Sequence, residues 1–523
     1  MKKMNLLAMS LVSAAALSFS SCSSNDDLGG GAGTQSQVDG FYMTLAIQTP
    51  TSNGTTRTVP GADKTQSAST EEQTVNKGTF FLVDQYGKVA FSRFVDNSTT
   101  ADEDTKWNGA NESQAGTKLI NIKVDKVAAG TTYKVYFLAG DNKVPDKINP
   151  TKHVFTATEQ FANPFATDNN FAMFNQNDAN VDGNGYTVVF TKDNKDKGNP
   201  AKVTYTKGSV VQNNAPIAIE RITARIDAPT SDATNITATY TGDKEELSEA
   251  VKEAMQDARD KVAGITLSRY AIVNLTKKAN VMQTWSNSAL SIPSDITMWQ
   301  PTTSFGGEKL FADGGFTTVA ATPHNYVFEN TDADPTKMYF EYKVTLNPDK
   351  FVKIVNGEKT TEVMPADYKD TDPYAGTFYR YNNIIFTSFA QIFNHYADVT
   401  DIFDKGVDAA AMKAKLDKIF AMEEGTAKEK ALEEFRNTYD IEVFVKGLTY
   451  YRQDIVDKNL MTTGLPLIQR NTIYKLTVNN VFNIGAQVPN GEDEIDKKSL
   501  FYLNVTVSVN PWVLNNQDVN LGD

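Results

Sequence analysis

The chain has 523 residues, of which 40% are hydrophobic and 22% are charged, and its formal net charge is −13 at pH 7. A chain this acidic offers no basic surface that could displace counterions from phosphates, which argues against nucleic acid as a partner. Its one cysteine excludes a disulfide within the chain, so stability must come from packed hydrophobic cores.

The N-terminus resembles a bacterial lipoprotein signal. Basic residues precede an apolar stretch at 6–19, which is too short to span a bilayer as a mature helix. Small residues then lead to Cys22, so we predict a signal peptide at 1–21, cleavage between Ser21 and Cys22, and acylation of the thiol, for example with palmitate. The alternative is an ordinary secretory signal in which Cys22 has no role.

Strands are predicted over most of the rest of the chain. A Gly- and Ser-rich stretch at 22–36 indicates a flexible tether. After it, Phe41, Met43, Leu45 and Ile47 alternate with the intervening residues, as in a half-buried strand. Similar runs are found at 78–83, 132–138, 186–190, 217–226, 265–275, 338–346, 441–451, 473–481 and 501–509. Asn, Asp and Gly cluster between the runs, so the fold class is mainly β.

Helices are predicted in two regions of the second half. The first covers 245–262, with Asp243 as the expected N-cap and Gly264 as the stop signal. The second has one helix at 408–422 and another that opens at Thr426. Each has one apolar face, which is typical of an insertion packed on a β domain. A change of composition at 228–235 places the best domain boundary there.

Motifs for catalysis are missing from the sequence. The histidines His153, His324 and His395 lie far apart, and no phosphate-binding glycine loop, dinucleotide fingerprint or zinc-protease motif is present. We therefore expect no enzyme and no cofactor, although the 64 acidic residues leave a catalytic carboxylate pair open.

One fragment has the spacing of a calcium loop. Asp178, Asn180 and Asp182 match its first half, but Val189 stands where a bidentate Glu should close the coordination shell. A polar hairpin turn is therefore the favoured interpretation.

The two ends of the chain carry further signals. In the C-terminal run, Phe501, Leu503, Val505, Val507 and Val509 share one face of a predicted strand. Near the N-terminus, a polar segment with Gly and Pro contains Arg57, the first arginine of the chain. Flexible backbone of this kind is where proteases cut.

Together these stretches resemble the fimbrillins of Bacteroidales, the type V pilins, and most of all the shaft subunits of the minor, Mfa-type fimbria. The resemblance is carried by "LSFSSC", by "IAIERITARIDA" at 217–228, by "LTYYRQDI" with "LIQRNTIYKLTVNNVFNIG" within 448–485, and by the terminal "FYLNVTVSVNPWVLNNQDVNL". They occur in the family's order and cover nearly the whole chain, while the helical region near 390–437 shows nothing similar.

The resemblance implies two transthyretin-like β-sandwich domains, at 58–229 and 230–523, with helices inserted in the second. It also implies an outer membrane lipoprotein precursor that an arginine-specific protease cuts between Arg57 and Thr58. The cut removes a propeptide at 37–57 together with the first strand. A donor strand at about 500–523 of another subunit then fills the groove, building an extracellular fimbria for adhesion and biofilm formation.

The partners that the resemblance implies are other copies of the chain, accessory fimbrial subunits, the protease, and receptors on host or bacterial surfaces. Several alternatives stay open. The chain could be an anchor or tip subunit, or a surface-anchored glycan-binding β-sandwich lipoprotein. The tryptophans Trp107, Trp285, Trp299 and Trp512 are too widely spread to indicate an aromatic platform for glycans. The C-terminal strand could pair within its own domain, and Arg57 could be an ordinary surface charge.

Overall fold

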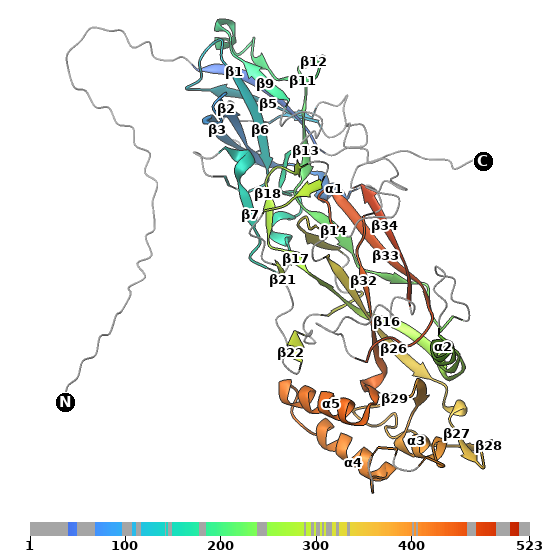
Figure 1. Cartoon of the computed structure of the whole chain (residues 1–523). Coiled ribbons are helices and arrows are strands. Elements are labelled where there is room, and N and C mark those ends of the chain that lie inside the picture. The colour runs from blue at the N-terminus through green and yellow to red at the C-terminus, as the bar shows by residue number, and fades with distance from the viewer. Residues whose placement is uncertain are drawn as a thin grey trace, which may run out of the picture. The chain divides into compact units, whose positions relative to one another are not determined.

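The computed structural model describes residues 40–49, 68–96, 107–110, 117–141, 143–144, 149–159, 161–176, 185–237, 248–286, 289–293, 298–299, 304–305, 308–309, 316–320, 324–331, 335–399, 402–403, 406–457, 467–487 and 503–511. The chain divides into two units, 1–39 and 40–523, and all the described residues belong to the second. Strands dominate this second unit, as Figure 1 shows, so the mainly β class predicted from the sequence is confirmed.

The first group of strands forms one connected sheet with two packed parts. Its strands are β1 (Phe41–Gln48), β2 (Lys77–Val83), β3 (Val89–Asp96), β4 (Trp107–Ala110), β5 (Thr117–Val124), β6 (Thr132–Ala139), β8 (Met173–Asn175), β9 (Tyr186–Val189), β10 (Ala201–Lys202), β11 (Thr204–Lys207), β12 (Val210–Asn213) and β13 (Ile217–Arg221). β1, β4, β5 and β10 make one part, which joins the rest through β13. Inward residues of both parts share one buried core, as in a β-sandwich.

A second sandwich lies further along the chain. One sheet contains β14 (Ala224–Asp227), β15 (Thr230–Ser231), β25 (His324–Val327), β33 (Thr472–Val481) and β34 (Leu503–Pro511). The other contains β16 (Val262–Val273), β24 (Thr317–Thr318), β26 (Lys337–Leu346) and β32 (Leu448–Asp454). Their facing side chains, including Ile226, Phe340 and Leu476, form a single buried core. The division into domains at 229 and 230 stays a prediction.

Five short two-stranded pairs lie outside these sheets in the described part of the chain. The two-stranded pairs are β7 (Val154–Thr156) with β18 (Lys278–Asn280), β17 (Leu275–Thr276) with β21 (Met298–Trp299), β19 (Thr284–Ser286) with β20 (Ala289–Ser291), β22 (Ser304–Phe305) with β23 (Glu308–Lys309), and β27 (Val352–Val355) with β28 (Glu358–Val363). The β7–β18 pair joins residues from the two halves of the chain, and a further buried cluster packs beside it.

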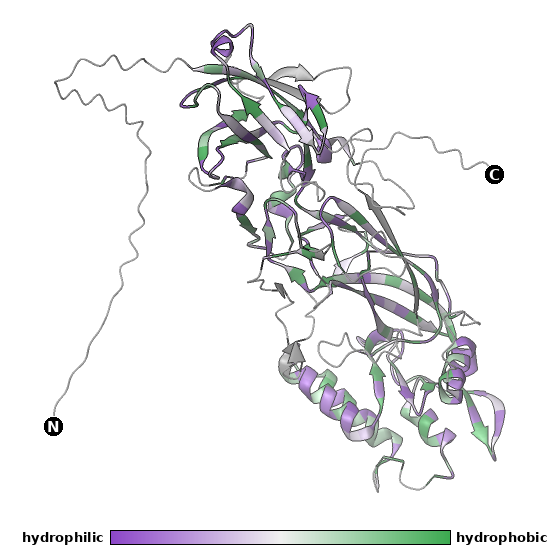
Figure 2. Cartoon of the chain, turned by 45° about the horizontal axis from the view of Figure 1, so that its top comes forward, coloured by the Kyte–Doolittle hydropathy of each residue, from purple (hydrophilic) through white to green (hydrophobic). Residues whose placement is uncertain are grey.

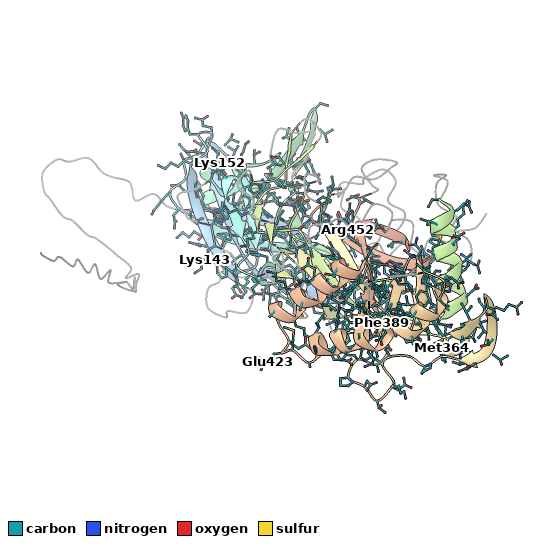
Figure 3. All side chains as sticks on the ribbon, turned by 60° about the horizontal axis from the view of Figure 1, so that its bottom comes forward. Lys143, Lys152, Met364, Phe389, Glu423 and Arg452 are labelled. Atoms are coloured by element: carbon teal, nitrogen blue, oxygen red, sulfur yellow. The ribbon has the colours of Figure 1, made fainter. Side chains whose placement is uncertain are left out.

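The helical insertion has a core of its own. Helices α3 (Phe389–His395), α4 (Ala409–Phe420) and α5 (Thr426–Tyr439) pack on β29 (Phe378–Tyr381), β30 (Ile384–Phe386) and β31 (Glu442–Phe444). Met412, Leu416 and Phe420 are buried on one face of α4, as the sequence predicts. Figure 2 shows hydrophilic and hydrophobic residues alternating along these helices, and Figure 3 labels Phe389, a buried member of this core.

Several details differ from the sequence prediction. The predicted strand at 441–451 is two strands, β31 and β32, with a 3-10 turn at Val445–Gly447 between them. Helix α2 (Glu249–Lys261) is capped by Ser248, whose side chain accepts a hydrogen bond from the Val251 amide, and not by Asp243. Gly264 does not stop this helix: the chain enters β16 at Val262, and a register shift next to Gly264 absorbs the glycine. The predicted strand at 217–226 is two strands, β13 and β14, which belong to different sandwiches.

Candidate functional site

The first strand is an interior strand of the first sandwich. β1 pairs antiparallel with β5 along its whole length, and its other edge pairs parallel with β10 and β13. Phe41, Met43, Leu45 and Ile47 are each 5% exposed or less. They contribute about 1.5–3 kcal/mol each to the core, a gross total on the order of 10 kcal/mol. Loss of this strand would leave one edge of β5 and one edge of β13 unpaired and the core without one wall.

After β1, the described chain resumes at a short helix, α1 (Thr70–Gln73), which has a complete capping box. The Ser69 hydroxyl accepts a hydrogen bond from the Glu72 amide at 3.3 Å, and the Ser69 amide donates to Glu72 Oε2 at 2.8 Å. Gln73 Nε2 also donates to the Ala68 carbonyl at 2.5 Å. These local bonds satisfy the first amides of the helix and hold the Glu72 carboxylate in place.

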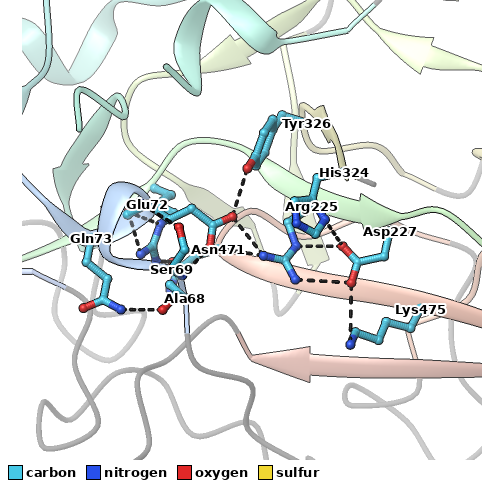
Figure 4. Close-up of polar contacts among 11 residues, drawn as sticks. Ala68, Ser69, Glu72, Gln73, Arg225, Asp227, His324, Tyr326, Asn471 and Lys475 are labelled. Carbon is cyan, nitrogen blue, oxygen red and sulfur yellow. Dashed lines mark hydrogen bonds and ion pairs between the residues drawn. The ribbon is translucent and has the colours of Figure 1, made fainter. Parts of the chain in front are cut away.

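Glu72 is the centre of a buried polar cluster that ties α1 to both sandwiches (Figure 4). Its carboxylate accepts hydrogen bonds from Arg225 Nη1 at 2.9 and 3.1 Å and from the Tyr326 hydroxyl at 2.9 Å. Its backbone carbonyl accepts from Nε and Nη2 of Arg221 at 3.0 and 2.8 Å. Arg221 is fully buried, and its Nη1 donates to Asn471 Oδ1 at 3.0 Å, next to the start of β33.

The cluster extends along β14 and β25. Arg225 Nε lies 2.7 Å from Asp227 Oδ1, which His324 Nδ1 also meets at 2.9 Å. Lys475 of β33 lies 3.6 Å from the second Asp227 oxygen. We refer to Glu72, Arg221, Arg225, Asp227 and Tyr326 as the α1 clamp, because they fix the helix by its side chain and by its backbone.

The charges of the clamp stabilise one another. Burial alone raises the pKa of Glu72, but Arg225, the Ser69 amide and Tyr326 outweigh it, and the pKa is below its ordinary value. Burial likewise raises the pKa of Asp227, but hydrogen bonds and charge interactions with His324 and Arg225 outweigh burial, so its pKa is below its ordinary value. Burial lowers the pKa of Arg221 to about 9, so its guanidinium stays charged at neutral pH. The carboxylates and guanidinium groups are therefore ionised partners.

The C-terminal strand lies at the edge of the second sandwich. β34 runs antiparallel to β33, with Val505 opposite Val478, Val507 opposite Leu476 and Val509 opposite Tyr474. Val507 is 4% exposed and reaches the core, while Val505 is half-buried. The other edge of β33 pairs with β14 and β15. In the single chain, therefore, this strand pairs within its own domain.

Several predicted site residues lie outside the described residues: Ser21, Cys22, Arg57, Thr58, Phe501 and the calcium candidates Asp178, Asn180 and Asp182. Their roles stay predictions. Among the residues that the structure does describe, no three His, Cys, Asp or Glu side chains converge on a metal site. In the same part of the chain, no helix is long and apolar enough to cross a membrane.

Sequence reasoning missed the α1 clamp. One local signal pointed to it: Ser69 with Glu72 is a capping-box pair, which marks the start of a helix. Nothing local indicates Tyr326, which is 254 residues from the carboxylate that it contacts.

Comparison with known proteins gives a family match for the C-terminal part of this chain. Residues 442–518 match the family described as major fimbrial subunit protein type IV, fimbrillin, C-terminal; these residues include β31–β34. No match was found among curated protein sequences.

Solved structures of low similarity include a cell adhesion protein of Parabacteroides distasonis, described as putative, with 12% identity and a TM-score of 0.42, covering 92% of this chain and 98% of that one. They also include the C-terminally truncated tip fimbrial protein Mfa3 of Porphyromonas gingivalis, with 11% identity, a TM-score of 0.28, and coverage of 90% and 100%. The resemblance to fimbrillins predicted from the sequence is confirmed by the match at 442–518.

Proposed function

We propose that this chain is a fimbrillin, a structural subunit that polymerises into surface fimbriae by proteolysis and then exchange of a β-strand. The observation that carries the proposal is the position of β1 inside the first sandwich. β1 has four buried apolar residues and neighbours on both edges. In the sequence it is followed directly by the segment 50–67, which contains Arg57. A cut there separates β1 from the rest of the second unit, and removal of the strand opens a groove lined by β5, β10 and β13.

The α1 clamp gives the cut a defined consequence. Glu72 and its carbonyl are held by Arg225 of β14, Tyr326 of β25 and Arg221 of β13. β14 and β25 do not pair with β1, and β13 keeps its pairing with β8 when β1 leaves. Residues from 68 onward are therefore retained when 40–49 leave. Maturation therefore opens the groove and leaves the rest of the first sandwich in place.

The C-terminal strand is the proposed donor. β34 has a single described neighbour, β33, so it can leave its sheet without opening the sheet's interior. Its alternating apolar residues Leu503, Val505, Val507 and Val509, with Phe501 before them, have the spacing that the groove of a second copy requires. Donor and groove are different surfaces, so the contact is head-to-tail and builds an open filament.

The chain reaches the surface, in this proposal, as an outer membrane lipoprotein acylated at Cys22 after cleavage behind Ser21. An arginine-specific protease then cuts between Arg57 and Thr58 and releases the subunit from its lipid. Accessory fimbrial subunits would start or end the polymer, and the assembled fimbria would serve adhesion and biofilm formation.

The test is digestion of the purified full chain with an arginine-specific protease, with mass spectrometry and electron microscopy of the products. We expect Thr58 at the new N-terminus and filaments only after cutting. Arg57→Lys keeps the charge and should block both, whereas Arg259→Lys on α2 should block neither. A chain that forms filaments with 40–57 still attached would contradict the proposal, and retention of acylated Cys22 on cells would favour a lipid-anchored role.

A further inference from the structure

A polar cavity lies in the helical insertion, away from the elements of strand exchange. It has a volume of about 450 Å³ and lies where the end of α5 meets β31 and the turn between β29 and β30. None of its lining residues belongs to β1, α1, β33 or β34. Its function is therefore not explained by assembly.

Amide side chains form much of the cavity wall. Asn382 and Asn383 come from the β29–β30 turn, Asn437 from the last turn of α5, and Gln487 from the segment after β33. An amide offers both a donor and an acceptor, which is the combination that neighbouring hydroxyl groups require. Of these residues, Asn382, Asn383 and Asn437 are exposed, so solutes can reach them.

Two arginines line the cavity, and they differ. Arg380 is held by Glu442, whose Oε1 lies 2.6 Å from its Nη2, and it also donates to the Ile484 carbonyl at 3.0 Å. Arg436 is 8% exposed, and among the described residues its Nη2 donates to the Val443 carbonyl at 2.7 Å while its Nε has no partner. Because Arg436 lines the cavity, the charge of its guanidinium favours an anion there.

The nearby acids limit which anion fits. Asp440 and Glu442 also line the cavity; Asp440 is exposed, and Glu442 is paired with Arg380. A doubly charged phosphate would be repelled by both carboxylates, whereas a singly charged carboxylate loses less. Asp440 can instead accept hydrogen bonds from hydroxyl groups.

We propose that this cavity binds a sugar that carries a carboxylate, with the carboxylate at Arg436 and the hydroxyl groups at the asparagines and Asp440. The volume is within the range of small-molecule sites and holds one or two sugar rings. If the chain also polymerises as proposed above, each subunit of the filament presents one copy of the site, so weak single contacts add up along it.

The test is a calorimetric titration of the full, uncut chain with methyl glycosides. The probes are methyl β-D-glucuronide, methyl α-D-galacturonide and the methyl glycoside of N-acetylneuraminic acid, with methyl β-D-glucoside as the neutral match of the first. We expect at least one acidic probe to bind, at least about tenfold more tightly than the neutral one, as a charge-assisted hydrogen bond predicts. Added salt should weaken this binding.

Variants localise the site. Arg436→Gln should weaken binding at least about tenfold. Because Arg436 is buried, the double variant Asn382→Gly with Asn383→Gly provides a second readout. Both asparagines have positive φ, 47° and 64°, which glycine adopts without strain, so the turn is kept while the amides are lost.

The matched control is Asn356→Gly, which sits at φ 51° in the β27–β28 turn, outside the cavity. It should leave affinity unchanged. Failure of every acidic probe to bind, equal binding of the neutral glucoside, or unaltered affinity in both folded cavity variants would overturn the proposal. Because the titration uses the uncut monomer, each of these results leaves strand exchange untouched.

Discussion

β1 and β34 have the same alternating sequence pattern but are held in different ways. β1 has neighbours on both edges, and its four inward residues are fully enclosed in the core of the first sandwich. β34 covers one edge of β33, and of its inward residues Val507 is buried while Val505 is half-buried. Alternation of apolar and polar residues therefore identifies a strand, but it does not show how many neighbouring strands pair with it. The number of paired neighbours decides whether the strand can leave without opening a core.

The largest expected effect is that of removing each strand in turn. A chain that begins at Thr58 loses β1 and a gross burial on the order of 10 kcal/mol, so amides of β5 and β13 should exchange hydrogen far faster. A chain that ends at residue 500 should lose protection only in β33. Hydrogen-exchange mass spectrometry of both truncated chains would show which strands lose protection. Equal loss of protection across both sandwiches in both truncations would remove the distinction between the two strands.

The next effect concerns the α1 clamp, which separates the part that leaves from the part that stays. Glu72→Gln removes the buried carboxylate that Arg225 contacts, while the Glu72 carbonyl that Arg221 contacts is kept. We expect a loss of about 3–5 kcal/mol in the free energy of unfolding. Chemical denaturation of the full chain measures it. Glu253→Gln, at an exposed position of α2, is the control and should have no measurable effect.

The clamp should also make stability depend on pH. The pKa values of Glu72 and Asp227 are lowered in the folded chain, so both favour folding while ionised. Their contribution is complete above their ordinary values near pH 4 and is lost as the pH falls through the lower folded-state values. The Glu72→Gln variant should show a shallower decline in that acidic window than the unmodified chain. Identical slopes would show that Glu72 contributes nothing to acid unfolding.

Single truncations of side chains sharpen the comparison on a smaller scale. Leu45→Ala in β1 removes a fully buried side chain and should cost about 2–5 kcal/mol. Val507→Ala in β34 removes fewer atoms from a strand with one described neighbour and should cost less. Urea midpoints of the two variants give the comparison, and a larger loss for Val507→Ala would reverse the ranking of the two strands.

The strands were predictable because their signal is local. The alternation at 41–47 and 473–481 requires only that one face be buried, and both appear as β1 and β33. The helical stripe at Met412 and Leu416 was predictable for the same reason. The prediction of Asp243 as the N-cap was wrong because Ser248, directly before α2, is the residue that caps the helix. The prediction of Gly264 as a stop signal was wrong because a register shift in β16 accommodates the glycine within a strand.

The rest of the site could not be read from the sequence because distant contacts create it. Glu72 meets Arg225 across 153 residues of chain, and no local pattern joins them. The apolar run at 217–226 reads as one strand, yet tertiary pairing assigns its halves to different sandwiches. The cavity beside Arg436 depends on the meeting of α5 and β31 with the β29–β30 turn, which lies apart from them in the sequence.

The most direct test asks which strand lies beside β5 in assembled filaments. In the single chain, Thr44 is the partner of Asn121 on β5, and Thr506 is the partner of Thr477 on β33. Directly opposed residues of antiparallel strands are close enough for a disulfide, and the one natural cysteine, Cys22, is removed by the cut. Filaments of Asn121→Cys chains with a second cysteine placed in turn at 504, 506 and 508 should form disulfides between subunits. A second set of chains with Thr477→Cys and Thr506→Cys reports the pairing of the single chain. Crosslinking only within one chain in that set, with none between subunits in the Asn121→Cys filaments, would contradict strand exchange.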